Sequence, residues 1–298
     1  MPPSRSAIWS ALLAVYVIWG STYLGIKYAI GSIPPFLMAA ARFLLSGIIL
    51  YAFAIRRGDR SDKPGFPEWR SAFVLGFFMM VGGNGGVVWA QQHVTTGMAS
   101  LLIATTPLWL SLMARAFLKE PISRSTAGGL LLGVVGVALL LDLAPANGHA
   151  SSLAGSLAVL LAAFAWSAGS VYSRKATLPK RPLVGIALQM IAGGFLLLLI
   201  SIFAGEPAAF EWSRVTGASL AGFVYLVFFG SLIGFSCYLW LLRVAPISLV
   251  STYAFVNPVV ALFLGWFFLN ETLSPREIAG AAVILAAVGM IVRGKKPA

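Results

Sequence analysis

The side chains with the clearest capacity for chemistry are aromatic and uncharged polar residues that interrupt long apolar runs. Trp19, Thr22 and Tyr23 follow the i, i+3, i+4 spacing of one helical face. Tyr253 and Asn257 are four residues apart and share a face in the same way. A polar group that faces lipid is costly, so these side chains are expected to face the interior of a helix bundle or a cavity. The chemistry they indicate is the binding of a small solute.

The complete set of residues that we predict to line such a cavity comes from five separate apolar runs. Its members are Trp19, Thr22, Tyr23, Asn84, Trp166, Ser170, Phe235, Tyr238, Tyr253 and Asn257. The alternative for each residue is a packing role, in which it bonds a neighbouring helix or lies at the membrane interface.

Charged groups are scarce inside the apolar runs, and this limits the chemistry further. Arg42 lies well within the run at 34–55 and needs a partner, which can be a substrate carboxylate or a group of backbone carbonyls. No Asp or Glu falls at the middle of any run, so the acid that proton-driven carriers usually relay through is missing. An ammonium group would have to rest on aromatic faces.

Catalytic and cofactor chemistry has little to use in this chain. The chain has one cysteine, Cys237, and two histidines, His93 and His149, both in expected connections, so we predict no metal and no cofactor. An intramembrane serine protease needs a serine–histidine pair, a prenyltransferase needs acid-rich metal sites, and an ATPase needs a Walker-type loop. None of these is evident. A polytopic membrane enzyme and a channel-like facilitator are the alternatives to a carrier.

The elements that position these residues are membrane helices. Hydrophobic residues make up 59% of the 298-residue chain and charged residues only 10%, with a mean hydropathy of +0.90, whereas soluble domains carry about 25% charged residues. A spanning helix needs about 20 apolar residues. Ten candidates occur, near 8–28, 34–55, 70–91, 96–118, 125–142, 153–173, 183–204, 215–242, 247–269 and 276–292. We therefore predict an all-α integral membrane protein with ten transmembrane helices.

The net charge of +12 is explained by membrane orientation rather than by nucleic-acid binding. Of the 21 Lys and Arg residues, all but Lys27, Arg42, Arg214 and Arg276 fall on one side when alternate loops are assigned to opposite sides. This bias predicts that both termini are cytoplasmic. The expected partners are the lipid bilayer and a small-molecule substrate, with the protein a monomer or a weak dimer.

The chain also repeats itself. Pro107 and Pro258 are 151 residues apart, and so are Gly83 and Gly234, while an offset of 147 pairs Trp19 with Trp166. We interpret 7–142 and 153–293 as two copies of a five-helix unit. Because five is odd, the second copy starts from the opposite side of the membrane, so the repeats are inverted around a central cavity. Inverted repeats are typical of secondary transporters; a receptor with an old duplication is the alternative.

Matching prolines and glycines suggest paired hinges in the two copies. Pro107 and Pro258 each remove a helix hydrogen bond, and Gly83 and Gly234 leave backbone that bends at little cost. Static curvature is the alternative for the prolines. Glu271, like its repeat counterpart Glu120, comes just before a new apolar run, where helix capping or a loop ion pair is favoured over transport chemistry.

Three motifs resemble those of the EamA family of the drug/metabolite transporter superfamily. They are Trp19-Gly20-Ser21-Thr22-Tyr23, Ala165-Trp166-Ser167 with Gly169-Ser170-Val171-Tyr172, and Tyr253-Ala254-Phe255-Val256-Asn257-Pro258. The resemblance covers nearly the whole chain. It implies a basket of helices around a largely apolar cavity and an inner-membrane exporter of small metabolites, with neutral or aromatic amino acids as the expected substrates.

Overall fold

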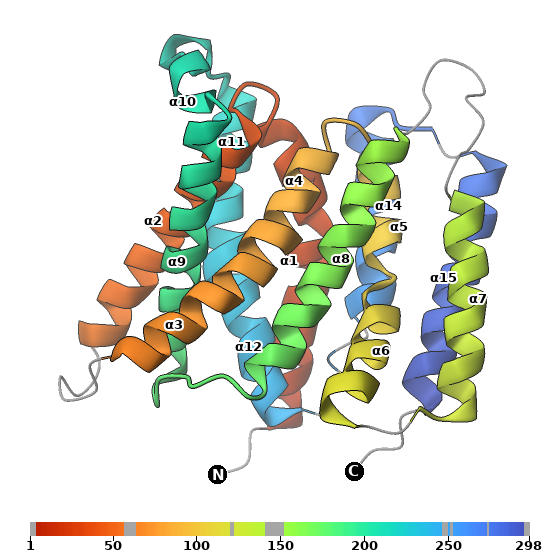
Figure 1. Ribbon diagram of the computed structural model, residues 1–298. Helices are drawn as coiled ribbons and strands as arrows, with labels where there is room; N and C mark the ends of the chain where they lie inside the picture. The colour runs from red at the N-terminus through yellow and green to blue at the C-terminus, as the bar shows by residue number, and fades with distance from the viewer. Residues whose placement is uncertain are drawn as a thin grey trace.

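The computed structural model describes residues 4–56, 64–119, 122–140, 152–245, 250, 253–272 and 274–294. Within these ranges the chain is helical and contains no strand, as the composition predicts. The long helices lie side by side in one bundle, and α1 begins at the same end of the bundle at which α15 finishes (Figure 1). Glu120 and His149 lie outside the described residues.

The elements follow one another along the chain with short connections. Their bounds are α1 Arg5–Ala29, α2 Pro35–Arg56, α3 Phe66–Leu75, η1 Gly76–Gly85, α4 Gly86–Ala90, α5 Thr96–Ile103, α6 Thr106–Leu118, α7 Arg124–Leu140, α8 Leu153–Ser173, α9 Pro182–Phe203, α10 Glu206–Ala209, η2 Trp212–Arg214, α11 Gly217–Tyr225, η3 Leu226–Phe235, α12 Ser236–Val244, α14 Tyr253–Leu269 and α15 Pro275–Gly294.

Seven of the described helical segments are long and apolar enough to cross a membrane. They are Arg5–Ala29, Pro35–Arg56, Phe66–Ala90, Thr96–Leu118, Leu153–Ser173, Pro182–Phe203 and Gly217–Leu241, and two shorter apolar helices cover Val256–Leu269 and Ile278–Ala287. Large apolar side chains such as Phe203, Phe263 and Phe267 are exposed on the outside of the bundle. Lipid is the environment that such a surface requires.

Short polar residues start several of these helices. The side-chain oxygens of Ser4, Thr95, Ser152 and Thr216 each accept a hydrogen bond from a backbone N–H in the first turn of α1, α5, α8 and α11. The N–H groups of a first helical turn have no partner within the helix, so each cap satisfies one of them. The helix ends are thereby fixed by sequence-local chemistry.

Two of the long apolar segments, Phe66–Ala90 and Gly217–Leu241, each contain a π-helical stretch. Gly76–Gly85 (η1) and Leu226–Phe235 (η3) each cover ten residues between regular α-helical turns. The predicted hinge glycines Gly83 and Gly234 lie inside these stretches. π-Helical turns are rare and are found mostly at functional sites. The periodicity of the sequence had indicated ordinary helix here.

The two prolines predicted as matching kinks are placed differently. A break at Ala104 and Thr105 separates α5 from α6, and Pro107 stands in the first turn of α6. Pro258 lies inside α14, which continues without interruption from Tyr253 to Leu269. The Thr106 hydroxyl donates to the carbonyl of Ile103 at 2.6 Å, so the carbonyl that Pro107 cannot bond has a local partner.

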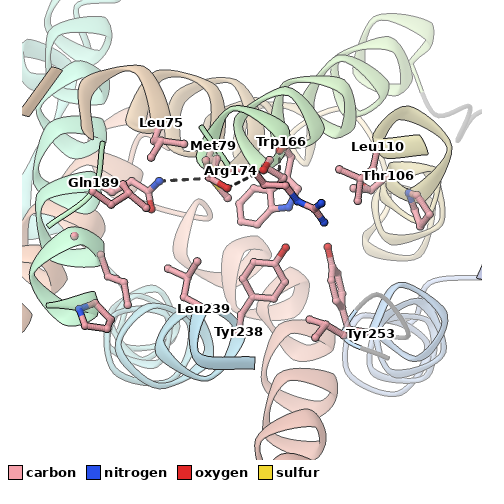
Figure 2. A pocket seen from close by; sticks show the side chains of 18 residues that line it. Leu75, Met79, Thr106, Leu110, Trp166, Arg174, Gln189, Tyr238, Leu239 and Tyr253 are labelled. Carbon is pink, nitrogen blue, oxygen red and sulfur yellow. Dashed lines mark hydrogen bonds between the residues drawn. The ribbon is translucent and has the colours of Figure 1, made fainter. Parts of the chain in front are cut away.

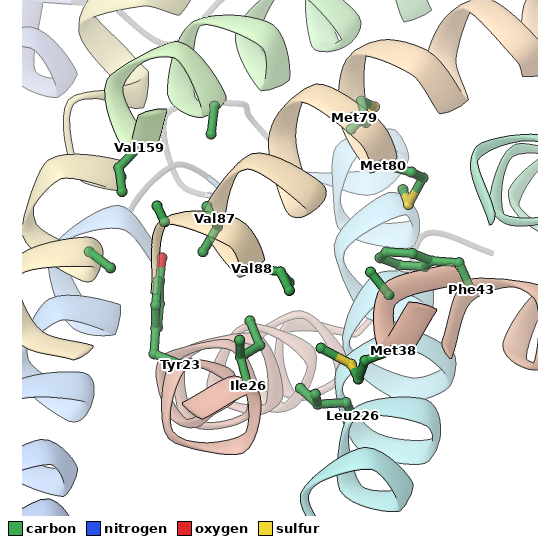
Figure 3. Close-up of a cluster of buried hydrophobic side chains, with 14 of the residues drawn as sticks. Tyr23, Ile26, Met38, Phe43, Met79, Met80, Val87, Val88, Val159 and Leu226 are labelled. Carbon is green, nitrogen blue, oxygen red and sulfur yellow. The ribbon is translucent and has the colours of Figure 1, made fainter. Parts of the chain in front are cut away.

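The core lies where α1, α2, α4, η1 and η3 meet. Tyr23 and Ile26 of α1, Met38 and Phe43 of α2, and Leu226 of η3 are buried together there (Figure 3). Elsewhere α2 packs against α9 and α7 against α15 along their lengths. A Cβ on Gly76 would lie 2.6 Å from the backbone nitrogen of Gly193, so η1 approaches α9 closely only because both residues are glycine.

Candidate functional site

Five aromatic rings from five elements meet at the centre of the bundle. Trp19 of α1 lies 5.9 Å from Trp166 of α8, 6.1 Å from Phe235 of η3, 4.8 Å from Tyr238 of α12 and 5.3 Å from Tyr253 of α14, measured between ring centroids. Several pairs meet edge to face, which is a favoured geometry for aromatic rings. We call these five residues the aromatic cluster. All five are among the predicted cavity residues.

A cavity of about 260 Å³ lies on one side of the aromatic cluster. Figure 2 shows Trp166, Tyr238 and Tyr253 around it, with Gln189 directed at the sulfur of Met79. The cavity extends to Arg174 and Leu178 in the connection between α8 and α9. That connection is at the end of the bundle where α1 begins, so we call this space the near cavity (Figure 1).

A smaller cavity of about 90 Å³ lies on the other side of the cluster, and we call it the far cavity. Its lining residues are Trp19, Thr22, Tyr23, Ile26, Arg42, Gly83, Asn84, Val87, Ile103, Thr106, Ala162, Trp166, Gly230, Phe235, Tyr253 and Asn257. Thr106, Trp166 and Tyr253 line both cavities. The three residues therefore form part of the wall between the two spaces.

The structure brings all ten predicted cavity residues to one or both of these spaces. Trp19, Thr22, Tyr23, Asn84, Trp166, Phe235, Tyr253 and Asn257 line the far cavity, and Trp166, Ser170, Tyr238 and Tyr253 line the near one.

The four predicted hinge residues are more dispersed. Pro107 lines the near cavity and Gly83 the far one, whereas Gly234 and Pro258 line neither. Gly234 instead faces the Trp19 ring, because a Cβ added there would lie 2.6 Å from Trp19 Nε1.

Backbone carbonyls accept hydrogen bonds from several polar side chains that line the far cavity. Trp19 Nε1 donates to Gly230 O at 3.3 Å, and Thr22 Oγ1 donates to Trp19 O at 2.6 Å. Asn84 Nδ2 donates to Met79 O at 3.2 Å. The Asn257 amide, turned so that its nitrogen meets its acceptors, donates to Tyr253 O at 3.1 Å and Tyr16 O at 3.2 Å. The amide oxygens of the two asparagines can therefore accept hydrogen bonds from a solute, as can the hydroxyl oxygens that line the cavity.

Arg42 is the one cation that lines the far cavity, judged on the described residues. Only 4% of its surface is exposed, its Nε donates to Ser231 Oγ at 2.8 Å, and its guanidinium carbon lies 4.8 Å from the centre of the Phe43 ring. No described carboxylate lies within salt-bridge distance of it. The structure thus places the predicted cation against the predicted cavity.

Several residues of the near cavity were not predicted. Gln189 is one of them, and its Nε2 lies 3.6 Å from Met79 Sδ. Thr106 and Met79 also line the space. A signal for Gln189 was available, because it is a polar residue inside an apolar run at a position equivalent to Arg42.

Polar contacts tie the helices together at the end of the bundle beyond the far cavity. Lys27 Nζ donates to Gln91 O at 2.8 Å, and Gln91 Nε2 donates to Tyr23 O at 3.1 Å, joining α1 to the end of α4. Glu271 accepts from the backbone N–H groups of Thr96 (2.8 Å) and Gly97 (3.2 Å). Glu271 therefore caps α5, a helix far away in sequence, rather than the helix that follows it.

The fold and the cavities are those of a polytopic membrane transporter, and comparison with known proteins identifies the group. The model of the EamA-like transporter family matches residues 5–142 and 153–293, and the chain belongs to that family. It is 36% identical over 293 residues to the "Uncharacterized inner membrane transporter YedA" of Escherichia coli, covering 97% of this chain and 91% of the relative. It is 27% identical over 305 residues to the "Probable amino-acid metabolite efflux pump" of Salmonella typhimurium, covering 98% of this chain and 96% of the relative.

A solved structure described only as "Crystal structure of protein" has the same fold. It superposes with a TM-score of 0.67 at 22% identity and covers 96% of both chains. The resemblance drawn from the tryptophan, serine and proline motifs is therefore confirmed at the level of the family. The names of the relatives indicate transporters and not enzymes.

Proposed function

We propose that the protein is a secondary transporter that exports small amphipathic metabolites, most specifically neutral or aromatic amino acids or related compounds, by alternating access. The observation that carries the proposal is the aromatic cluster, which stands as a layer between two cavities at the centre of the bundle. A solute with an apolar body and polar ends fits such a passage, because aromatic faces and a few polar groups surround it. The relative named as an amino-acid metabolite efflux pump supports the substrate class.

The proposed architecture has ten spans arranged as two inverted five-helix repeats, 7–142 and 153–293. The ten arise when α7, α14 and α15 are counted with the seven long apolar segments. Two features support the inversion. The π-helical stretches η1 and η3 occur in the third span of each repeat.

The second feature is a reciprocal contact between the repeats. A Cβ on Gly234 would meet the Trp19 ring at 2.6 Å, and a Cβ on Gly83 would meet the Trp166 ring at 3.0 Å. Each half thus presents its tryptophan to the glycine of the other. Two inverted repeats related by a two-fold axis would form such a reciprocal pair of tryptophan–glycine contacts.

The positions of the cavities agree with a conformer that opens toward the side on which the chain begins. The near cavity reaches the connection between α8 and α9, whereas the bonds of Lys27 and Glu271 tie helices at the opposite end. With both termini in the cytoplasm, as the distribution of Lys and Arg suggests, this conformer faces inward. Opening of the far end with closure of the near end would complete the cycle.

An export assay tests the proposal. Cells that express the protein are loaded with a phenylalanine-containing dipeptide, and phenylalanine released to the medium is compared with that from cells without the protein. We expect faster release, which Trp19→Ala and Trp166→Ala abolish. Trp9→Ala is the matched control, since Trp9 is 57% exposed on the outside of α1.

Counterflow in proteoliposomes separates the carrier from the alternatives. A carrier accelerates uptake of labelled phenylalanine when unlabelled phenylalanine is inside, a channel-like facilitator does not, and an enzyme changes the solute. Failure to move phenylalanine and a broader panel of neutral amino acids in either assay would contradict the proposed function.

A further inference from the structure

Arg42 carries hydrogen-bonding capacity that the protein does not use. A guanidinium group has five N–H donors. Within the part of the chain that the structure describes, its Nε–H donates to Ser231 and neither of its terminal nitrogens donates to a protein acceptor. No described acidic side chain forms an ion pair with it. A cation that is 96% buried in a membrane protein and only singly bonded is costly unless a further partner arrives.

The surroundings of Arg42 hold the guanidinium in place and leave one direction open. Ser231 fixes the Nε edge, and the η3 backbone passes so close that a Cβ on Gly230 would lie 3.0 Å from Nη2 and 3.1 Å from Thr22 Cγ2. The ring of the adjacent Phe43 lies beside the guanidinium carbon. Tyr225 lies close enough to interact with the charge of Arg42, and Arg42 lines the far cavity together with Thr22 and Tyr23.

We propose that Arg42 and Ser231 form an anion subsite in the far cavity, and that the substrates of this transporter carry a carboxylate. This inference rests on the proposed function and names the part of the substrate that the site recognises. A planar guanidinium fork binds a carboxylate through two parallel hydrogen bonds, and the unused terminal nitrogens supply such donors. Among the described residues that line the far cavity there is no Asp or Glu, so none of them opposes a carboxylate by its charge.

The other polar groups of the far cavity fit the opposite end of an amino acid. The amide oxygens of Asn84 and Asn257 accept hydrogen bonds once their nitrogens are bonded to backbone carbonyls. These neutral acceptors suit an ammonium group without competing for Arg42. The aromatic rings of Trp19 and Tyr253 cover the apolar part. The cavity thus has one strong anion-binding group and only weak cation-binding groups.

In the part of the chain that the structure describes, no equivalent cation lines the near cavity deep in the bundle. Gln189, which occupies the repeat position of Arg42, is a neutral amide that contacts Met79. Arg174 lines that cavity too, but in the connection at its mouth. The carboxylate is therefore held most firmly on the far side of the aromatic cluster.

The test uses two probes, L-phenylalanine and L-phenylalaninamide, at a mildly acidic pH that keeps both amino groups protonated, so that the probes differ only at the acid group. Binding to the purified full chain is followed by tryptophan fluorescence excited at a wavelength that the phenyl group does not absorb. We expect saturable binding of the acid and binding of the amide weaker by about tenfold to a hundredfold, the loss typical of one charge-assisted bond. Arg42→Gln should abolish this preference, and Arg42→Lys should retain part of it.

Two further variants keep the test decisive if Arg42→Gln does not fold. Ser231→Ala removes the group that fixes Nε, and Gly230→Ala places a methyl group against Nη2. Both variants should reduce the preference of the protein for the acid over the amide. Arg214→Gln is the control, because Arg214 is exposed and paired with Glu211. Equal binding of acid and amide, binding of neither, or a preference that survives in the Arg42, Ser231 and Gly230 variants would overturn the anion subsite.

The two proposals fail in different ways. Export that does not discriminate the acid from the amide would contradict the proposed anion subsite but not the proposed transport function. Acid-selective binding without any export or counterflow would contradict the proposed transport function but support the anion subsite.

Discussion

A methyl group placed on Gly234 should disturb the aromatic cluster from within. The Cβ of Gly234→Ala would lie 2.6 Å from Trp19 Nε1 and 2.9 Å from Trp19 Cδ1. To reach an ordinary contact of 3.4 Å, the indole must move by roughly 0.8 Å. Tyr238 and Tyr253 pack against the other sides of the indole at 4.8 and 5.3 Å between ring centroids, so little room is available. The hydrogen bond from Trp19 to Gly230 O, already 3.3 Å long, would be lost or distorted.

The expected cost follows from these contacts. Overpacking of a core by one methyl group typically destabilises by about 1–3 kcal/mol, and replacing glycine by alanine in a helix returns up to about 1 kcal/mol. A net destabilisation of about 1–2 kcal/mol is expected, which a folded membrane protein tolerates. Export should fall much more than stability, because Trp19 belongs to the wall between the two cavities.

Two matched variants make the comparison quantitative. The Cβ of Gly83→Ala would meet the Trp166 ring at 3.0 Å, a milder contact, and the Cβ of Gly217→Ala would meet nothing within 4 Å. Export and the melting temperature in detergent should therefore decrease in the order Gly217→Ala, Gly83→Ala, Gly234→Ala. If Gly234→Ala exports and melts like Gly217→Ala, the close fit of Trp19 against η3 is not part of the transport machinery.

Three other outcomes are expected. Glu271→Gln should lower the melting temperature by a few degrees, because a charged cap on two N–H groups of α5 becomes a neutral one; an unchanged melting temperature would show that the cap contributes little. Pro107→Ala and Pro258→Ala should shift cysteine accessibility toward opposite facing states if the prolines are paired hinges, and shifts in the same direction, or none, would make them static. Reporters fused at Ala298 and within 143–152 should report opposite sides of the membrane, and the same side would contradict the ten-span arrangement.

The residues around the cavities were predictable because helical spacing and the sequence repeat indicate the same interior helix faces. Trp19 and Tyr23 share a face by spacing alone, and the offset of 147 then points to Trp166 and Ser170. Because polar side chains are costly in lipid, these residues are expected to point toward the interior of the bundle. Arg42 follows from the same rule, since a cation inside an apolar run must turn toward the interior.

The π-helical stretches were not predictable from periodicity. An i→i+5 hydrogen bond shifts the helical phase by one residue. Whether a segment forms such bonds depends on its packing contacts with the neighbouring helices. In η1 the neighbours are Gly193 of α9 and Trp166 of α8, which contact Gly76 and Gly83 respectively. Those contacts are set by the tertiary packing and have no signature in the segment itself.

The helix is interrupted before Pro107 but continues through Pro258, and this difference has a local cause. The matching positions of the two prolines in the sequence repeat do not reveal it. Thr105 and Thr106 precede Pro107, and each hydroxyl donates to a carbonyl three residues earlier at 2.6 Å, which satisfies the end of α5. Val256 and Asn257 precede Pro258, and valine has no such group. A helix can therefore end cheaply before the first proline, whereas α14 continues through the second.

Equivalent positions of the two proposed repeats carry unequal chemistry. Arg42 corresponds to Gln189, and Tyr23 corresponds to Ser170. The buried cation of the first pair thus lines the far cavity and its neutral counterpart the near one, where Arg174 lies in the connection at the mouth. In a carrier that is not coupled to an energy source, the solute gradient sets the direction of net transport. The asymmetry of the two cavities therefore cannot set it. A substrate can only favour the conformer that binds it better. A carboxylate bound by Arg42 would therefore stabilise whichever conformer presents Arg42 to the solute, while the two proposed repeats would supply the two states of the proposed transport cycle.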